Sequence, residues 1–383
     1  MLFLRQTFSA SRGPMAAFIA MGVTWGAFMA TMPDIKDGLG VSDGTLGLLL
    51  LAGPVAAITM MLLAPRLGGV LGGAAVPLAT LAMGLAVMLP AQAGSAPWFA
   101  GAMMAMGGST GALDVLMNAR LSTIEAARGL KLMNLNHALY SFAYGAAAGL
   151  TGWARAAGLG PGAILLAAGL VVLALAFASI EREGRIDGFG RKRGDGPAPR
   201  LGPVPWLAGA LILVAFLTEN AAEAWSALYI ERDLGAGTGA GSLGPALLGL
   251  WMGLGRLAGQ MVAMRVSDQA LLRGGVWVAL LGCALVVAAT GPLSAYLGFV
   301  VLGLGASVMV PTALAVVGRL ADPARRSHAI ARATVLGYMG FFLGPPALGL
   351  AAELVGLRLA YGLVGLALLA AAGARIMLAR HER

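Results

Sequence analysis

The chain has 383 residues, of which 59% are hydrophobic and only 11% are charged. So apolar a composition excludes an ordinary soluble domain, because water cannot be the main solvent for such a surface. The formal net charge is +9, but the basic residues lie in short segments between apolar stretches rather than in one patch, which argues against nucleic acid as a partner.

Apolar stretches of about 20 residues recur along the whole chain, and each is long enough to cross a hydrocarbon core of roughly 30 Å as a helix. The first stretch follows Arg5 and Arg12 without a convincing small-residue cleavage site, so we interpret it as a retained helix. The sequence therefore predicts an all-α membrane protein. Its twelve expected transmembrane helices lie at residues 14–33, 45–65, 70–91, 97–121, 131–153, 160–180, 204–229, 242–263, 272–291, 293–317, 329–352 and 358–378.

The basic residues orient these helices. If the N-terminus is cytoplasmic, all but four of the 26 Lys and Arg residues fall on the cytoplasmic side. The exceptions are Lys36, Arg155, Arg232 and Arg358. This asymmetry follows the positive-inside rule and predicts a multi-pass protein of the bacterial inner (plasma) membrane with both termini in the cytoplasm.

The longest polar segment divides the chain nearly in half. It is rich in Arg, Gly and Pro and predicts a cytoplasmic linker at 181–203 between six-helix halves at 1–180 and 204–383. The halves share short matches in the same order, which favours two pseudo-symmetric repeats; chance similarity between apolar sequences is the alternative. The matching segments are 35–40 with 230–235, 44–47 with 241–244, and 136–139 with 327–330.

Three acidic residues lie deep in expected spans: Asp114 in 97–121, and Glu219 and Glu223 in 204–229. An ionised carboxylate near the bilayer centre costs about 2.5–3.5 kcal/mol, so each should face a cavity or a partner. Glu219 and Glu223 are four residues apart and share one helical face. The pair is a candidate for proton coupling, as is Asp114; the alternative is a protonated Glu that hydrogen-bonds between helices for structural reasons.

Polar and aromatic side chains in the spans give candidates for substrate binding. Asp114 and Asn118 share a face, and a second polar stripe runs along the span at 131–153; both face either a cavity or each other. The stripe consists of Asn134, His137, Ser141 and Tyr144. Aromatic residues that can stack on a sugar or line a cation site are Trp25, Trp225, Tyr229 and Trp251.

The residue types and motifs that the sequence lacks limit the substrates and reactions that fit it. No Lys or Arg lies in the middle third of an expected span, since Arg120 and Arg256 lie toward cytoplasmic ends. A neutral or cationic substrate therefore fits better than a phosphate or a dicarboxylate. The single cysteine, Cys283, excludes a disulfide framework. The sequence has no Walker A motif, metal-ligand cluster or serine-histidine-acid arrangement, so we expect neither an enzyme nor a cofactor.

Several motifs resemble the major facilitator superfamily, and more closely its branch related to fucose permeases. They are Gly111-x-x-Asp114-x-x-Met117-Asn118, Glu125, Met133, His137-Ala138-x-x-Ser141, Glu219 with Trp225-Ser226-Ala227-Leu228-Tyr229, and Gly337-Tyr338-x-Gly340-Phe341-x-x-Gly344-Pro345-Pro346. The resemblance implies two halves that rock about a central site, commonly driven by protons. It implies proton binding at Asp114 or Glu219 and substrate contact near Asn118, His137 and Trp225, and it adds Tyr338 as a binding candidate.

The sequence departs from that family between the second and third spans. The family's gating loop usually reads Gly-x-x-x-Asp-Arg-x-Gly-Arg, whereas residues 64–69 here keep Arg66 and Gly68 but lack the acid before the arginine. The gating salt bridge that this motif supports therefore lacks its usual acid.

The leading hypothesis is a secondary active transporter, a monomer in the lipid bilayer that takes up a small, sugar-like solute together with protons. Efflux of amphipathic or cationic compounds is an alternative on the same fold. A membrane sensor or assembly factor that transports nothing is a third hypothesis, and it predicts that neutralising Asp114 and Glu219 leaves activity intact.

Overall fold

The computed structural model describes residues 10–130, 132–186, 202–263, 265–321 and 326–381. Regular structure in these ranges is helical, without a strand, as the all-α prediction requires. Contacts divide the chain into a first unit, residues 1–41 and 49–193, and a second unit, residues 42–48 and 194–383. The linker predicted at 181–203 lies mostly outside the described residues, and its boundaries stay a prediction.

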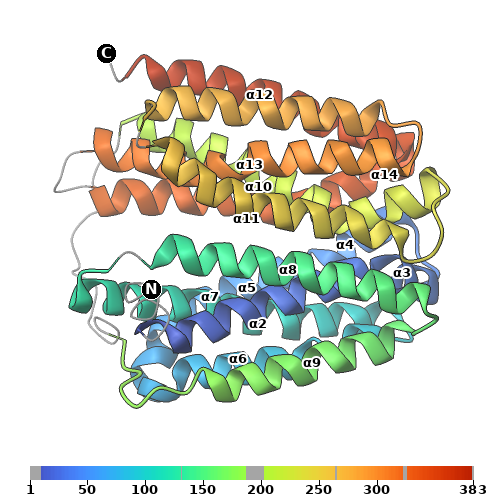
Figure 1. Ribbon diagram of the computed structural model, residues 1–383, viewed down its shortest axis with the longest axis horizontal. Coiled ribbons are helices and arrows are strands. Elements are labelled where there is room, and N and C mark those ends of the chain that lie inside the picture. Colours follow the sequence, from blue (N-terminus) through green and yellow to red (C-terminus); the bar gives the residue numbers. More distant parts are fainter. Residues whose placement is uncertain (1–9, 131, 187–201, 264, 322–325, 382–383) are drawn as a thin grey trace. The chain divides into compact units, whose positions relative to one another are not determined.

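The helices of the first unit follow the chain from blue to green in Figure 1. They are α2 (Arg12–Ala30), α3 (Met32–Leu39), α5 (Ala52–Leu71), α6 (Ala75–Ala86), α7 (Ala96–Arg128), α8 (Met133–Ala156) and α9 (Pro161–Ala178). Two short 3₁₀ turns, Gly72–Ala74 and Pro90–Gln92, join neighbouring helices. Helix α4 (Asp43–Leu50) begins within the short segment that belongs to the second unit.

The second unit continues from yellow-green to red in Figure 1. Its helices are α10 (Val204–Leu228), α11 (Leu243–Ala263), α12 (Asp268–Val287), α13 (Pro292–Leu320) and α14 (Arg326–Ala379). A π-helical turn, Tyr229–Asp233, extends α10, and a 3₁₀ turn, Ala240–Ser242, precedes α11. Helix α14 is broken at Gly356, whose φ of 80° is readily adopted only by glycine, and so contains two expected spans.

The helices pack in the same order in both units. In the first, α2 packs on α8 and α9, α5 on α7, and α6 on α7 and α9. In the second, α10 packs on α14, α11 on α13, and α12 on α13 and α14. In each unit, therefore, the first helix contacts the last two, the second contacts the fourth, and the third contacts the fourth and the last.

Glycine allows the closest of these contacts. A Cβ atom added to Gly26 of α2 would overlap the backbone of Tyr144 in α8, and one added to Gly305 of α13 would overlap the backbone of Ala279 in α12. Helices that meet this closely gain dispersion contacts and leave no room for larger side chains.

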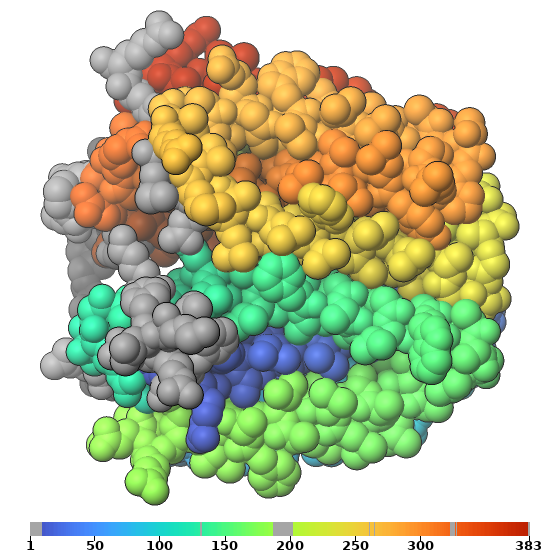
Figure 2. Space-filling model, viewed as in Figure 1, coloured from blue at the N-terminus to red at the C-terminus, as the bar shows by residue number. Residues whose placement is uncertain are grey.

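Eight helical stretches among the described residues are long and apolar enough to cross a membrane. Two of them, Asp43–Gln92 and His328–Ala379, have 50 and 52 residues, and each contains two expected spans. Helices α7 and α8 are more polar, because they carry the two polar stripes. All expected ranges coincide largely with helices, while the number of crossings stays a prediction. Helix α12 forms part of the face in Figure 2 and exposes Trp277 and Leu281, which suits contact with lipid.

The structure corrects the expected gating loop. Helix α5 extends to Leu71, so Arg66 and Gly68 lie in a helix and the turn is at Gly72–Ala74. Helix α5 continues past Pro65 because one proline removes a single backbone donor, and the apolar run through Leu71 outweighs that loss. The Arg66 side chain is exposed.

Candidate functional site

Helices α7 and α8 of the first unit share a chain of polar contacts. Asn118 Nδ2 donates to Asp114 Oδ1 at 3.0 Å and to the Asp114 carbonyl oxygen at 2.8 Å. Asn118 Oδ1 lies 3.2 Å from His137 Nε2. Because the carboxylate fixes which way the amide faces, Oδ1 accepts, and we assign the proton of this contact to His137 Nε2. The network therefore links the acid on α7 to an imidazole on α8.

His137 has two further contacts, one through its ring and one through its backbone. Phe18 of α2 meets it edge to face, with ring centroids 4.9 Å apart. Ser141 Oγ donates to the His137 carbonyl oxygen at 3.2 Å and is almost fully buried. Four of the residues predicted from the two polar stripes, Asp114, Asn118, His137 and Ser141, thus lie together.

The other substrate-binding candidates of the first unit lie outside this network. Asn134 is exposed near the start of α8. Tyr144 is buried beside Tyr140, with ring centroids 6.3 Å apart. Trp25 meets Phe28 edge to face within α2, at 5.9 Å. The binding roles of Asn134, Tyr144 and Trp25 stay predictions.

The second unit has a buried charged cluster between α10 and α11. Glu219 and Glu223 lie one turn apart on α10, and each residue is only 7% exposed. Arg256 of α11 donates through Nη2 to Glu219 Oε1 at 3.3 Å. Both Glu219 and Arg256 act electrostatically on Glu223. Two carboxylates and one guanidinium therefore share a largely dehydrated environment.

The role of Arg256 is not among those predicted from the sequence, which places this residue toward the cytoplasmic end of its span. Helix α11 instead brings its guanidinium to Glu219, near the middle of α10. The sequence feature that could have indicated this role is the arginine itself, because a cation within a 21-residue apolar helix needs a partner or water.

Three polar side-chain atoms of α10 are buried without a hydrogen-bond partner: Asn220 Oδ1, Trp225 Nε1 and Ser226 Oγ. Leaving such an atom unpaired costs about 1–3 kcal/mol, and groups of this kind are often found at functional sites. Asn220 lies between the two acids in the sequence, and Trp225 and Ser226 follow Glu223.

The two tyrosine candidates of the second unit pack among aromatic rings. Tyr229 is fully buried and donates its hydroxyl to the Val286 carbonyl oxygen at 2.9 Å, which is a structural contact. Tyr338 of α14 lies beside Phe216 and Phe341, at centroid distances of 5.3 and 6.1 Å.

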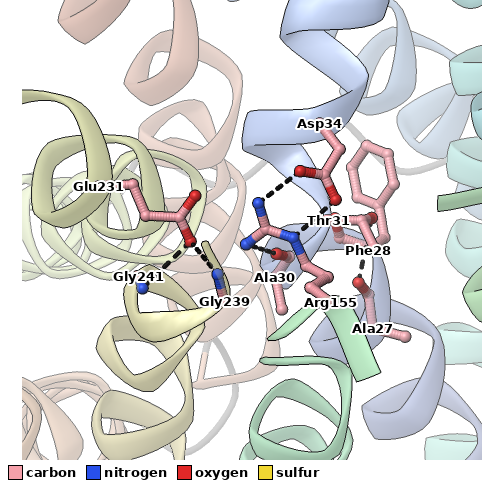
Figure 3. Close-up of polar contacts among 9 residues, drawn as sticks. All are labelled: Ala27, Phe28, Ala30, Thr31, Asp34, Arg155, Glu231, Gly239 and Gly241. Atoms are coloured by element: carbon pink, nitrogen blue, oxygen red, sulfur yellow. Dashed lines mark hydrogen bonds and ion pairs between the residues drawn. The ribbon is translucent and has the colours of Figure 1, made fainter. Parts of the chain in front are cut away.

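Figure 3 shows polar contacts at helix ends that the sequence did not predict. In the first unit, Arg155 of α8 contacts both carboxylate oxygens of Asp34 at 2.6 Å and donates to the Ala30 carbonyl oxygen at 3.1 Å. In the second unit, Glu231 accepts from the backbone amides of Gly239 and Gly241 at 3.0 and 3.1 Å. These contacts hold the connections at the ends of α2 and α10.

No group of three or more His, Cys, Asp or Glu residues that could hold a metal ion occurs in the part of the chain that the structure describes. The clusters on α7 with α8 and on α10 with α11 can instead bind protons and donate or accept hydrogen bonds.

Comparison with known proteins identifies the family of this chain and supports its fold. The sequence pattern described as Major Facilitator Superfamily matches residues 251–383. An uncharacterized MFS-type transporter of Yersinia pestis is 30% identical over 360 residues, which are 93% of this chain and 92% of the relative. A bacterial homolog of the human lysosomal transporter Spinster, in an inward-facing and unoccupied conformation, has a TM-score of 0.74 at 14% identity and covers 98% of this chain and 97% of its own. The nucleoside transporter NupG has a TM-score of 0.70 at 12% identity, with 96% and 98% covered.

Proposed function

The chain belongs to the major facilitator superfamily and is a membrane secondary transporter, not an enzyme, and we propose that it couples the movement of a small polar solute to protons. The prediction of the superfamily and its fold is thereby confirmed. The narrower resemblance to fucose permeases stays a prediction. The bacterial relative and the distribution of basic residues support an inner-membrane location with cytoplasmic termini.

The observation that carries the proposal is the charge balance between α10 and α11. Glu219 has Arg256 as its ion-pair partner, and Glu223, one turn further along α10, also interacts electrostatically with Arg256. With both acids ionised the cluster carries one negative charge in excess, and an excess charge in a dehydrated environment is costly. One proton on Glu223 neutralises the cluster. We therefore assign proton binding to Glu223. Its protonation changes the charge beside the ion pair of Glu219 and Arg256.

The polar network of the first unit supports solute binding. Asp114, Asn118 and His137 form a connected set of donors and acceptors, and Asp114 and Asn118 are each partly exposed within it. Such a set suits hydroxyl groups, which both donate and accept. Asp114 also remains a candidate for a second proton site.

The charges favour a neutral or cationic solute. Arg256 is the arginine found in the charged cluster, and its contact with Glu219 reduces its attraction for an anion. A sugar-like solute taken up with protons is the leading proposal. Buried carboxylates also suit an amphipathic cation, so export of such compounds is the second candidate.

The test begins with a thermal-shift screen of the detergent-purified protein against sugars, polyols, nucleosides, amines and drugs. A ligand at 100 times its dissociation constant adds about 2.7 kcal/mol to the apparent free energy of unfolding. The stabilising compound is then followed in proteoliposomes in two assays, accumulation driven by a pH gradient and counterflow exchange without one.

Glu223→Gln should abolish gradient-driven accumulation and keep counterflow, because the glutamine mimics the protonated acid permanently. The matched control is Asp37→Asn, which removes a carboxylate that is exposed at the end of α3. If Glu223→Gln accumulates solute as the unmodified protein does, Glu223 is not the coupling acid. If no gradient drives accumulation and only export is observed, the efflux proposal replaces uptake.

A further inference from the structure

An arginine and a tryptophan meet on the surface of the second unit. Trp206 lies in the first turn of α10, and Arg332 lies two turns into α14. The guanidinium carbon of Arg332 is 5.0 Å from the centroid of the Trp206 ring. Trp206 is 48% exposed and Arg332 is exposed as well. The pair is therefore a cation–π contact accessible from outside the protein.

The helices beneath the pair are tightly packed. A Cβ atom added to Gly209 would lie 3.0 Å from Leu336 Cβ and 3.2 Å from the Ala333 carbonyl oxygen, so α10 and α14 nearly touch one turn away. Leu207, next to Trp206, packs on the buried core of the unit. The backbone from which Trp206 and Arg332 project is thus held in place on both helices.

The pair lies at the depth where lipid headgroups are expected. The 25 residues of α10 span about 37 Å, which exceeds a hydrocarbon core of roughly 30 Å. The first turn of α10 therefore reaches the interface, where tryptophan is enriched. One turn further along α14, Val335 is 67% exposed and offers an apolar surface to an acyl chain.

The charge of Arg332 is not balanced along these helices. Residues 202–218 and 326–352 contain no Asp or Glu. The contact that the structure gives Arg332 is with the face of an indole ring. A guanidinium stacked in this way can still use its in-plane N–H groups, whose fork matches the oxygens of a phosphate.

We propose that Arg332 and Trp206 bind the headgroup phosphate of an anionic phospholipid. Arg332 donates to the phosphate oxygens, Trp206 orients the guanidinium, and Val335 contacts the first part of an acyl chain. The site requires that the chain lies in a membrane, and it is independent of proton coupling and of the transported solute. Lipid binding and transport can therefore succeed or fail separately.

The test is native mass spectrometry of the purified protein with phosphatidylglycerol and phosphatidylcholine of the same acyl chains. The unmodified protein should prefer phosphatidylglycerol. Arg332→Gln should reduce that preference about fivefold, the effect of one basic residue at an anionic surface. Trp206→Leu should reduce it too, although it removes no charge. The matched control, Arg380→Gln, removes an exposed charge just beyond α14 and should change the preference little.

Three results would overturn the proposal. Equal losses in Arg332→Gln and Arg380→Gln would mean diffuse attraction by net charge. An unchanged preference for phosphatidylglycerol in Trp206→Leu would show that the Trp206 ring does not contribute to the site. Displacement of the lipid by inorganic phosphate at equal concentration would assign the site to a free anion. A melting temperature measured without lipid shows that each variant is folded, so loss of binding cannot be confused with loss of structure.

Discussion

Arg155 holds both carboxylate oxygens of Asp34 at 2.6 Å, although the two residues are 121 positions apart in the chain. The arginine side chain is 1% exposed and that of the aspartate is 25% exposed. A third bond, to the Ala30 carbonyl oxygen, ties the same guanidinium to the end of α2. The contact therefore joins α8 to both α2 and α3 within the first unit.

Arg155→Ala should lower the free energy of unfolding by about 3 kcal/mol, because it leaves Asp34 without its ion-pair partner in a largely buried place. The quarter exposure of Asp34 keeps the loss near the lower end of the usual range. The measurement is thermal unfolding in detergent. In the double variant with Asp34→Ala the loss should be smaller than the sum of the two single losses; strict additivity would show that the two side chains do not interact.

Much of the fold follows from hydropathy, because a helix in hydrocarbon must satisfy its own backbone groups and so needs a long apolar run. Spacing along one helix also predicted contacts well, since Asp114 and Asn118, four residues apart, do bond to each other. Contacts between helices were not predictable in the same way. The sequence leaves open whether the two polar stripes face a cavity or each other, and the contact of His137 with Asn118 shows that they meet. The sequence does not specify that Arg256 meets Glu219, because that depends on which helix faces which.

The end of α5 could not be predicted either. Pro65 and the pair Gly68-Gly69 are typical of a loop, yet the helix continues to Leu71. Tertiary packing of a membrane helix outweighs such local signals, because every exposed backbone group is costly in lipid. The Arg155 to Asp34 pair is hard to predict for the opposite reason: both residues follow the end of an expected span, in polar connections where charges need no partner.

The charged cluster of the second unit should respond non-additively to substitution. Glu219→Gln and Glu223→Gln each leave one carboxylate near Arg256, whereas the double variant removes both acidic neighbours. The double variant should therefore lose more stability than the sum of the single variants, by roughly 0.5–3 kcal/mol. Thermal unfolding of the four proteins measures this coupling. A sum equal to the double loss would mean that Arg256 does not interact with Glu223.

His137 should be replaceable by glutamine but not by leucine. The amide N–H group of a glutamine at this position can stand near the place of His137 Nε2 and donate to Asn118 Oδ1, whereas a leucine leaves that oxygen unpaired. Loss of one such bond costs about 1–1.5 kcal/mol, so His137→Leu should weaken solute binding about tenfold and His137→Gln much less. The thermal-shift titration of the solute identified in the screen gives both affinities. Equal affinities in the two variants would exclude a role for this hydrogen bond in solute binding.

Gly26 should tolerate no side chain, because α2 and α8 are in contact there. The Cβ atom of an alanine would overlap the Tyr144 carbonyl oxygen, which belongs to the backbone and cannot rotate away. Forcing the helices apart should cost about 1–3 kcal/mol. The matched control is Gly101→Ala in α7, where an added Cβ meets nothing within 4 Å and alanine is the better helix former. Gly101→Ala should unfold at the same temperature as the unmodified protein or slightly higher, and Gly26→Ala at a lower one. If the two variants unfold at the same temperature, the packing of α2 on α8 is looser than the structure describes.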